Sequence, residues 1–367
     1  MKGSRRTSLR DIAQASGVGR TAVSLALRDD RRLPLPTRQR IQEVARRMGY
    51  APNPLVSRVM AMHRSTGGPH PLGTLGFLTA YPTREGWRNA TSLRYHDGAV
   101  ARAAQLGYRL EVFWTREPGM TGRRMTTVLR TRGIEGLILA ALPRAVGHLS
   151  LEWPRFAVAS LGYTTRRPAL HRAVHHHFEA MAVTLRLLLR RGYRRIGLAL
   201  DLGLDERVHH LWRAGFLVHQ DRLRQSDRIP VLLMRKPHGQ EFPGWFERHH
   251  PEAIIGSDPI IVEWLHDLGQ IVPDDVGFAH LDWSKHLGGI AGIDQNSEVV
   301  GATAVDLVVN QLHRGERGIP THPKVVLIEG RWTEGSTVRD MKRTATVPRS
   351  LTAVRITPSP RRPSGRG

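Results

Sequence analysis

The run LRDIAQASGVGRTAVSLALR, residues 9–28, decides the fold of the N-terminal part of the chain. Its first half has the spacing of a short helix, with Ile12, Ala13 and Ala15 as a small apolar face. The triplet GVG at 17–19 interrupts that helix, and a second helix is predicted over about 20–27. The run therefore predicts two short helices joined by a glycine-containing turn.

The second helix sorts its side chains by the helical period. The inward positions are Ala22, Val23, Ala26 and Leu27, and the outward positions are Arg20, Thr21, Ser24, Leu25 and Arg28. Prolines at 34 and 36 precede a third helix, predicted over 37–48, and the glycine at 49 suits its end. The three helices together predict a helix-turn-helix, whose second helix lies in the major groove of DNA. The alternative is a three-helix cap on some other domain.

Basic charge gathers at the two ends of the chain. The whole sequence of 367 residues has a formal net charge of +23. Residues 1–65 hold 14 Lys and Arg against 4 Asp and Glu, and residues 339–367 hold 8 against 1. A basic N-terminal module is what the phosphate backbone of DNA attracts. The alternative is that an arginine-rich composition has no binding role, and this alternative applies best to the C-terminal end.

Several N-terminal motifs resemble the lactose/galactose repressor family of bacterial transcription regulators. They are LRDIA at 9–13, ASGV at 15–18, TAVS at 21–24, TR at 37–38 and GYAPN at 49–53. The resemblance implies base reading by Arg20, Thr21 and Leu25, and contacts to the DNA backbone by Ser24, Arg28, Arg32 and Asn53. The chain departs from the family pattern at Gly19, usually serine, and at Ala22, usually threonine. Leu25 stands where arginine is common; leucine can touch a thymine methyl but cannot bond guanine.

After residue 53 the family has a hinge helix that inserts a leucine into the minor groove. The corresponding segment here is PLVSRVMAM, residues 54–62, with Val59 at the leucine position and Met60 beside it. Either side chain could act as the apolar wedge, and the alternative is a plain linker. The run STGGPHP at 65–71 is typical of a domain boundary.

From residue 72 the sequence alternates short apolar runs with amphipathic helices. The predicted strands are 74–79, 109–113, 136–140, 156–160, 195–199, 253–256 and 276–279, and the predicted helices are 93–106, 123–132, 178–191, 207–220 and 299–313. This alternation is typical of a doubly wound α/β architecture. Further family motifs, among them GIEGLI at 133–138 and VPDDV at 272–276, imply the two-lobed fold of periplasmic binding proteins, with a ligand between the lobes.

The ligand-binding residues are predicted from strand ends and from the resemblance. Ligands bind beyond the carboxyl ends of parallel strands, and Asp258 and Asp282 each follow a predicted strand closely. The family often contacts its ligand at the positions of Ser257, Asp282 and Gln295. The predicted effector residues are Tyr81, Trp87, Trp212, Ser257, Asp258, Asp282, Trp283 and Gln295, a set that suits a sugar-like molecule. The alternative is that the carboxylates cap helices and the tryptophans belong to the core.

Two departures and one cluster complicate this site. His176 stands where the family usually has aspartate, and Trp212 stands where it often has a ligand-binding arginine. The triplet His175, His176 and His177 suggests a metal, but adjacent residues point in different directions and no other ligands accompany them. We therefore expect no metal and no cofactor.

The remaining features exclude several classes of protein. The chain has no cysteine, which excludes disulfides and cysteine catalysis and suits a reducing cytoplasm. It has no nucleophile elbow, HExxH or phosphate loop, so we expect no enzyme activity. It has no signal-peptide pattern at its N-terminus and no apolar run of about 20 residues, so we expect no membrane span.

The sequence thus predicts an α-helical helix-turn-helix DNA-binding domain plus an α/β two-lobed periplasmic-binding-protein-like domain. The expected divisions are 1–53 for the DNA-binding domain, 54–71 for the hinge helix and linker, 72–338 for the effector-binding and dimerisation domain, and 339–367 for a disordered basic tail. The expected function is a transcription regulator, by family habit a repressor. It would bind a pseudo-palindromic operator in double-stranded DNA as a homodimer and respond to a small-molecule effector. The alternative function is a solute-binding receptor.

Overall fold

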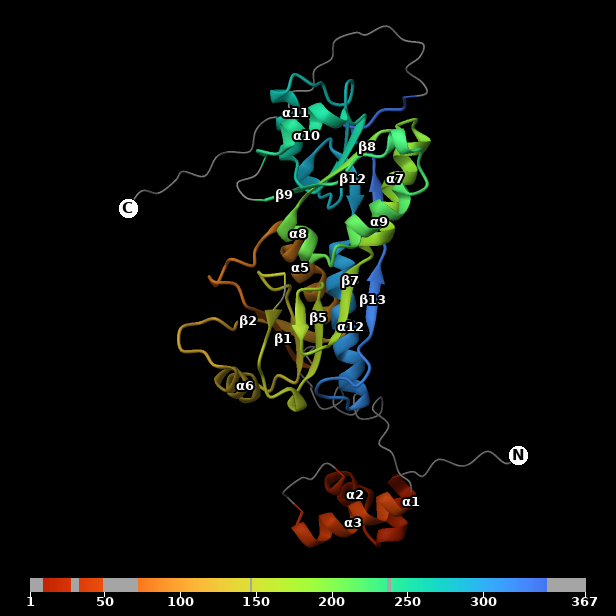
Figure 1. The fold of residues 1–367 in the computed structure, drawn as a ribbon. Coiled ribbons are helices and arrows are strands. Elements are labelled where there is room, and N and C mark those ends of the chain that lie inside the picture. Colours follow the sequence, from red (N-terminus) through yellow and green to blue (C-terminus); the bar gives the residue numbers. More distant parts are fainter. Residues whose placement is uncertain (1–8, 28–32, 49–71, 146, 236–238, 342–367) are drawn as a thin grey trace, which may run out of the picture. The chain divides into compact units, whose positions relative to one another are not determined.

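The computed structural model describes residues 9–27, 33–48, 72–145, 147–235 and 239–341. Contacts within the chain separate a small N-terminal unit, residues 1–70, from a large unit, residues 71–367. The two units are coloured red and orange-to-blue in Figure 1. Each unit is built around its own hydrophobic core.

The described residues of the N-terminal unit form the helices α1 (Leu9–Ser16), α2 (Arg20–Ala26) and α3 (Leu35–Arg47). Their shared core consists of Ile12, Ala13, Val23, Ala26, Ile41 and Ala45. Gly17 has a φ of +65°, the left-handed conformation that lets the chain turn sharply after α1. The side-chain amide of Gln42 donates to the carbonyl of Ala26 at 2.8 Å, which ties α3 to the end of α2. The predicted helix-turn-helix is therefore present.

Two details of this unit differ from the prediction. The third helix begins at Leu35 rather than at 37, because proline is tolerated in the first turn, where its missing N–H has no helical partner. Ala15, predicted on the apolar face of α1, is exposed, and the core side of the helix is completed by Ser16, whose hydroxyl donates to the carbonyl of Ile12 at 2.6 Å.

Lobe 1 of the large unit is built on a six-stranded sheet in the order β13-β7-β5-β3-β1-β2. Its strands, all parallel, are β1 (Gly73–Thr79), β2 (Tyr108–Trp114), β3 (Gly136–Leu139), β5 (Ala157–Leu161), β7 (His171–His175) and β13 (Val325–Ile328). Helices α5 (Ala90–Gln105) and α12 (Ser297–Arg314) cover one face, and α6 (Gly122–Thr131) covers the other. Successive residues of β3 serve opposite faces, since Ile138 packs towards α5 and α12 and Leu137 towards α6. A short parallel pair, β4 (Gly147–His148) and β6 (Thr165–Arg167), lies apart from this sheet.

Lobe 2 has a second six-stranded sheet in the order β14-β12-β11-β10-β8-β9. Its strands are β8 (Ile196–Asp201), β9 (Leu232–Met234), β10 (Ala253–Gly256), β11 (Gly277–His280), β12 (Ala291–Asp294) and β14 (Arg331–Thr333), and only β14 runs antiparallel to its neighbour. Helices α7 (His177–Arg190) and α9 (Leu211–Gln220) cover one face, and α10 (Phe242–His249) and α11 (Ile260–Asp267) cover the other. The short helix α8 (Leu202–Arg207) follows the end of β8.

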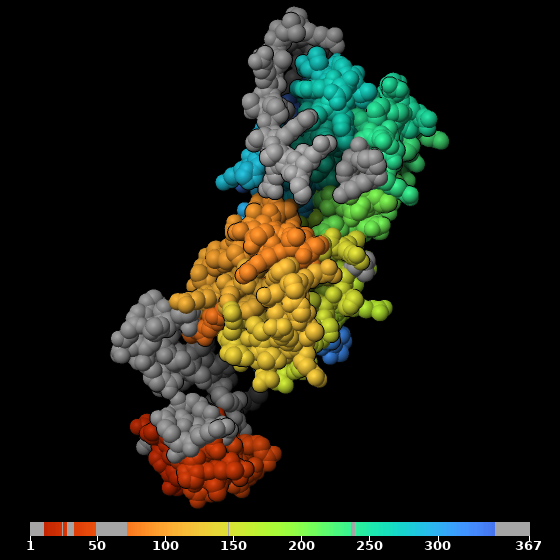
Figure 2. All heavy atoms as spheres, turned by 90° about the vertical axis from the view of Figure 1, so that its left-hand side faces the viewer, coloured from red at the N-terminus to blue at the C-terminus, as the bar shows by residue number. Residues whose placement is uncertain are grey.

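The chain passes between the two lobes three times, after β7, after β12 and after β13. The crossing segments bond to one another. The side-chain amide of Asn296 donates to the carbonyl of Glu329 at 2.8 Å, and the backbone N–H of His176 donates to the carbonyl of Ile328 at 2.8 Å. Figure 2 shows the orange and yellow residues of lobe 1 against the green and cyan residues of lobe 2. The carboxyl ends of β7 and β12 therefore meet at the boundary between the lobes.

The seven predicted strands and most of the predicted helices are confirmed to within a few residues. The helix predicted over 207–220 is wrong at its start, because α8 ends at Arg207 and α9 begins only at Leu211. Between them His209 and His210 have φ values of 57° and 59°, which breaks the helix. The buried carboxylate of Asp205 accepts a hydrogen bond from the His210 ring at 2.7 Å and stabilises this turn.

Candidate functional sites

The N-terminus of α2 presents the residues predicted to read DNA bases. Arg20 and Thr21 are exposed at its first two positions, Leu25 is partly buried, and Val23 and Ala26 fill the core behind them. The residue before the helix, Gly19, makes no side-chain cap, as its lack of a hydroxyl requires. In a helix-turn-helix, this end of the second helix is the part that meets base edges, and base reading by these residues stays a prediction. The predicted contacts Arg28, Arg32, Asn53, Val59 and Met60, and the side chain of Ser24, lie outside the described residues.

A second candidate site is a cavity of about 350 Å³ between the lobes. Its lining combines aromatic rings, imidazoles and hydrogen-bonding groups from both lobes. The residues that matter below are Tyr81, Asn89, Thr91, Tyr95, Tyr163, His175, His177, Arg207, Trp212, Asp282 and Gln295. Because the cavity lies at the carboxyl ends of strands from both sheets, its position is that of a ligand site in a two-lobed binding protein.

Four of the eight predicted effector residues line this cavity, namely Tyr81, Trp212, Asp282 and Gln295. The other four lie elsewhere. Trp87 is buried in the core of lobe 1, with its ring 5.6 Å from that of Phe77. Asp258 is exposed and accepts a hydrogen bond from the backbone N–H of Ile260 at 3.0 Å, at the start of α11. Ser257 directly follows β10 and Trp283 directly follows Asp282, but neither residue is part of the cavity lining.

His175 is held in one tautomer at the edge of the cavity. Its Nδ1 lies 2.8 Å from the carbonyl oxygen of Gln295, which can only accept, so Nδ1 carries the hydrogen. The Tyr95 hydroxyl, 2.7 Å from Nε2, is therefore the donor to His175. Burial lowers the pKa of His175 and raises the pKa of Tyr95, so both stay uncharged at neutral pH. The tyrosine oxygen keeps its lone pairs for an acceptor role.

Within the described part of the chain, three buried polar atoms of cavity-lining residues have no hydrogen-bond partner in the protein. They are His177 Nδ1, Trp212 Nε1 and Gln295 Oε1. The rings of His177 and Trp212 meet edge to face, with centroids 4.8 Å apart. Burial lowers the pKa of His177 well below its ordinary value, which keeps this imidazole neutral. An unpartnered buried polar atom costs about 1–3 kcal/mol, so these atoms favour a ligand that both donates and accepts hydrogen bonds.

Sequence reasoning missed several cavity residues, chiefly His175, Tyr95 and Arg207. Arg207, from α8 of lobe 2, donates through Nη1 to the carbonyls of Leu142 at 2.6 Å and Pro143 at 2.8 Å in lobe 1. The predicted helix over 207–220 hid this residue as an ordinary helical position. The histidine triplet at 175–177 did indicate the position of the cavity, although its three rings have different roles. His176 accepts a hydrogen bond from the backbone N–H of Glu179 at 3.2 Å and so caps α7.

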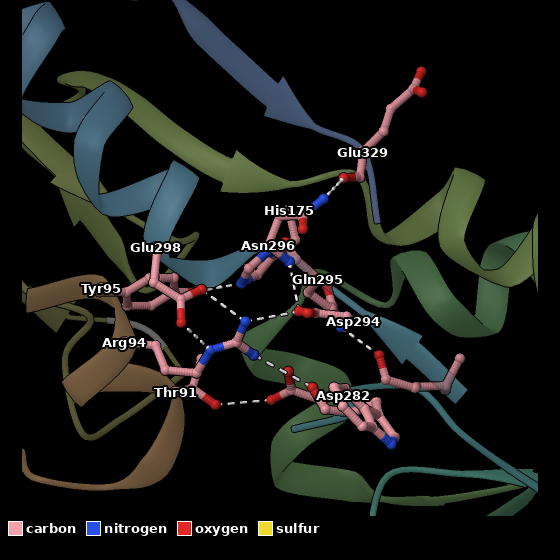
Figure 3. A network of polar contacts seen from close by, with 12 residues as sticks. Thr91, Arg94, Tyr95, His175, Asp282, Asp294, Gln295, Asn296, Glu298 and Glu329 are labelled. Carbon is pink, nitrogen blue, oxygen red and sulfur yellow. Dashed lines mark hydrogen bonds and ion pairs between the residues drawn. The ribbon is translucent and has the colours of Figure 1, made fainter. Parts of the chain in front are cut away.

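Direct hydrogen bonds also join the two lobes beside the cavity (Figure 3). The Thr91 hydroxyl of α5 donates to the carboxylate of Asp282 at 2.8 Å. Arg94, one turn further along α5, donates to Asp294 and Glu298 and to the carbonyl of Trp283. The carboxylate of Asp282 therefore faces both the cavity and the opposite lobe.

The described residues contain neither a metal-binding cluster nor a membrane-spanning helix. No group of three or more His, Asp or Glu side chains there is arranged to hold a metal ion. No helix there is long and apolar enough to cross a bilayer.

A small three-helix unit of the DNA-binding type joined to a two-lobed domain with a central cavity defines a class of ligand-responsive regulators. Residues 8–53 match the family described as bacterial regulatory proteins, lacI family, and residues 185–338 match the periplasmic binding protein-like domain. The two matches together support the lacI family of transcription regulators for this chain. The family match at its N-terminus sets it apart from the alternative of a solute-binding receptor.

Curated relatives and solved structures resemble this chain along most of its length. The HTH-type transcriptional regulator PtxS of Pseudomonas putida is 25% identical over 85% of this chain and 91% of its own length. The PtxS of Pseudomonas plecoglossicida is 25% identical over 84% of this chain and 89% of its own. Among solved structures, the complex of the transcriptional regulator CelR with cellobiose covers 90% of this chain and all of its own, with a TM-score of 0.54 at 15% identity. The lac repressor dimer bound to operator and the anti-inducer ONPF covers 91% and 100%, with a TM-score of 0.53 at 16% identity. These structures share the fold.

Proposed function

We propose that the chain is a transcriptional repressor that binds a pseudo-palindromic operator as a homodimer and is controlled by a sugar-like effector in the interlobe cavity. In this proposal it acts by binding alone, without catalysis, in the cytoplasm, where its DNA is found. The observation that supports an effector is the cavity itself, which is lined by neutral imidazoles, an indole N–H and a carboxylate. Each sugar hydroxyl both donates and accepts a hydrogen bond, which suits this lining.

Individual residues have distinct proposed roles at the effector. Asp282 accepts from ligand hydroxyls through the oxygen that Thr91 leaves free, since the Thr91 hydroxyl bonds only Oδ2. Trp212 offers its unpartnered Nε1 as a donor, and Gln295 offers Oε1 as an acceptor. The CelR–cellobiose complex is a structural neighbour whose ligand is a sugar, which supports this ligand class.

The effector proposal is tested by thermal unfolding of the full chain against a panel of neutral sugars and sugar phosphates. A ligand at a hundred times its dissociation constant adds about 2.7 kcal/mol, which corresponds to a rise of roughly 5–10 °C in the melting temperature. Asp282→Asn should weaken that ligand at least about tenfold and leave the protein folded. Asp258→Asn is the matched control, because Asp258 is exposed and outside the cavity. A broad panel without any stabilising compound, or equal effects of both variants, contradicts the proposal.

The operator proposal rests on the exposed start of α2 and on symmetry. One helix-turn-helix contacts a short half-site, and a two-fold symmetric dimer reads two of them in opposite orientation. The lac repressor structure named above is a dimer on its operator, which supports the same assembly here. Selection of bound sequences from a random DNA pool should give inverted half-sites, and sedimentation should give a dimer at micromolar concentration. Asymmetric single half-sites or a monomer would refute the dimeric arrangement.

A further inference from the structure

Arg94 joins the two lobes, although it is not part of the cavity lining. It lies on α5 in lobe 1. Its Nη2 donates to Asp294 Oδ1 at 2.8 Å and to Glu298 Oε2 at 2.7 Å, its Nε donates to Glu298 Oε1 at 2.7 Å, and its Nη1 donates to the carbonyl of Trp283 at 3.3 Å. Asp294 ends β12 and Trp283 follows β11, both in lobe 2, whereas Glu298 is in the first turn of α12. One guanidinium thus holds three segments together (Figure 3).

We propose that Arg94 is the positioning residue of the interlobe cavity, which ties the placement of Asp282 and Gln295 to the relative position of the two lobes. This inference rests on the proposed function, in which those two residues contact the effector. It assigns to Arg94 the regulation of that site rather than contact with the ligand.

The contacts on either side of Gln295 explain how Arg94 acts on it. Asp294, which Arg94 binds, also accepts a hydrogen bond from the backbone N–H of Asn296 at 3.0 Å, so the crossing segment 294–298 is fixed at both ends. Within that segment the backbone carbonyl of Gln295 accepts a hydrogen bond from His175 in lobe 1. The side-chain amide of Gln295 donates to the carbonyl of Leu281 in lobe 2 at 2.6 Å. A shift of the segment therefore moves a cavity residue against both lobes.

The contact with Trp283 acts on Asp282 in the same way. Trp283 directly follows Asp282, and the two are held from α5 by neighbouring turns, Asp282 by Thr91 and the Trp283 carbonyl by Arg94. The loop after β11 is thus attached to lobe 1 at two consecutive residues. Loss of the Arg94 contact leaves the Thr91 hydroxyl as the remaining hydrogen bond from α5 to this loop.

Charge makes this arrangement sensitive to the loss of one side chain. Arg94 is 20% exposed and its partner Asp294 is 25% exposed, so the pair is largely shielded from water. Burial alone lowers the pKa of Arg94, but the hydrogen bonds to Glu298 and Asp294 outweigh it and raise that pKa. The hydrogen bond from Arg94 likewise lowers the pKa of Glu298. Without the guanidinium, two carboxylates at the junction of β12 and α12 repel each other, which favours a different lobe arrangement.

The chain offers a matched control on the same pair of helices. Arg102 lies two turns further along α5 and donates from Nε to Asp306 of α12 at 2.8 Å. This ion pair joins α5 and α12 within lobe 1 and reaches nothing in lobe 2 among the contacts of the described residues. Arg94→Met and Arg102→Met therefore remove the same chemistry, but only the first removes an interlobe contact.

The test is hydrogen–deuterium exchange of the full chain with no sugar added, read at segments 280–283 and 202–208 of lobe 2. Arg94→Met should raise exchange there by about tenfold or more, whereas Arg102→Met should leave it within about twofold of the wild-type rate. Arg94→Lys should restore part of the protection, because a compact ammonium can pair with one carboxylate but cannot bridge two in the guanidinium's fork. If Arg94 only stabilised the fold, Arg94→Met would raise exchange in α5 and α12 to the same degree as in lobe 2. The control Arg102→Met would then raise exchange in lobe 2 as well.

Asp294→Asn is a milder second variant, because its amide keeps the shape of the carboxylate but removes the charge that Arg94 binds in lobe 2. It should raise exchange at 280–283 to a smaller degree than Arg94→Met. Wild-type exchange at both lobe 2 segments in Arg94→Met, or the same increase in Arg102→Met, overturns the proposal. If Arg94→Met does not fold, wild-type exchange in Asp294→Asn overturns the proposal alone. Because no ligand is used, a failure here is separate from a failure of the sugar screen.

Discussion

Helices α5 and α12 approach each other closely at two glycines, Gly98 and Gly301. A β-carbon added at Gly98 would lie 2.5 Å from the carbonyl carbon and 2.6 Å from the Cα of Glu298. One added at Gly301 would lie 2.8 Å from the carbonyl carbon of Tyr95. Carbon atoms in contact prefer about 3.5–4.0 Å, so either methyl group requires the helices to separate by about 1 Å. The obstructing atoms are backbone and cannot rotate away.

Gly98→Ala is therefore expected to destabilise the large unit, although helix propensity alone would favour alanine over glycine. Alanine is favoured over glycine inside a helix by about 1 kcal/mol. Overpacking a tight contact costs about 1–3 kcal/mol and occasionally more, and here the contact is with backbone on both sides. We expect a net loss of about 2 kcal/mol, or a fall of roughly 4–8 °C in the melting temperature.

The assay is thermal and urea unfolding of the full chain followed by circular dichroism. Gly244→Ala is the matched control, because Gly244 is inside α10 and no atom lies within 4 Å of its added β-carbon. That variant should gain up to about 1 kcal/mol from propensity alone. If Gly98→Ala proves as stable as the wild type while Gly244→Ala behaves as expected, the close approach of α5 and α12 is refuted. Movement of Glu298 in Gly98→Ala should also disturb the contacts of Arg94.

Three further outcomes are expected. Gln311→Leu should cost about 2 kcal/mol or more in urea unfolding, because the Gln311 amide bonds both the N–H and the C=O of Val158 inside lobe 1; an unchanged midpoint would contradict this role. Stability should fall as the pH drops below about 6.5, since burial lowers the pKa of His177 and the unfolded chain then binds the proton first. His177→Gln should flatten that fall between pH 7 and 5.5, and an unaltered pH profile would count against the buried neutral ring. Arg20→Ala should cost about 1–3 kcal/mol at one base position in binding assays on the selected operator, while Arg40→Ala, an exposed change on α3, should leave base preference intact.

The regular elements could be predicted because they depend on local pattern. The period of apolar residues in 9–48 is a property of neighbours three and four apart, and it predicts that Ile12, Val23 and Ile41 face inward, where they share one core. The short apolar runs from residue 72 onward likewise predicted seven of the twelve strands of the two sheets. The basic N-terminal charge and the family motifs indicate DNA binding for the same reason, because each is a property of a short continuous stretch of sequence.

Elements whose formation depends on distant partners were missed. The strands β12, β13 and β14 have three or four residues each, and they are strands because the chain returns from one lobe to the other beside them. The break between α8 and α9 depends on the buried carboxylate of Asp205, which accepts from His210. A helical period continues through such a break without any local sign, which is why the predicted helix ran from 207 to 220.

The candidate site divides along the same line. The strand-end rule and the family resemblance together placed Asp282 and Gln295 at the cavity, while Trp87 and Asp258 satisfied the same kinds of reasoning and lie in the core and at a helix start. What the sequence by itself determined was most of the helices and seven of the strands, because those follow from the spacing of apolar residues. Only the tertiary structure decided which polar groups face one another. Arg94 meets Asp294 across 200 residues of chain, and a contact of that range is fixed by the topology of the two sheets and by no local pattern.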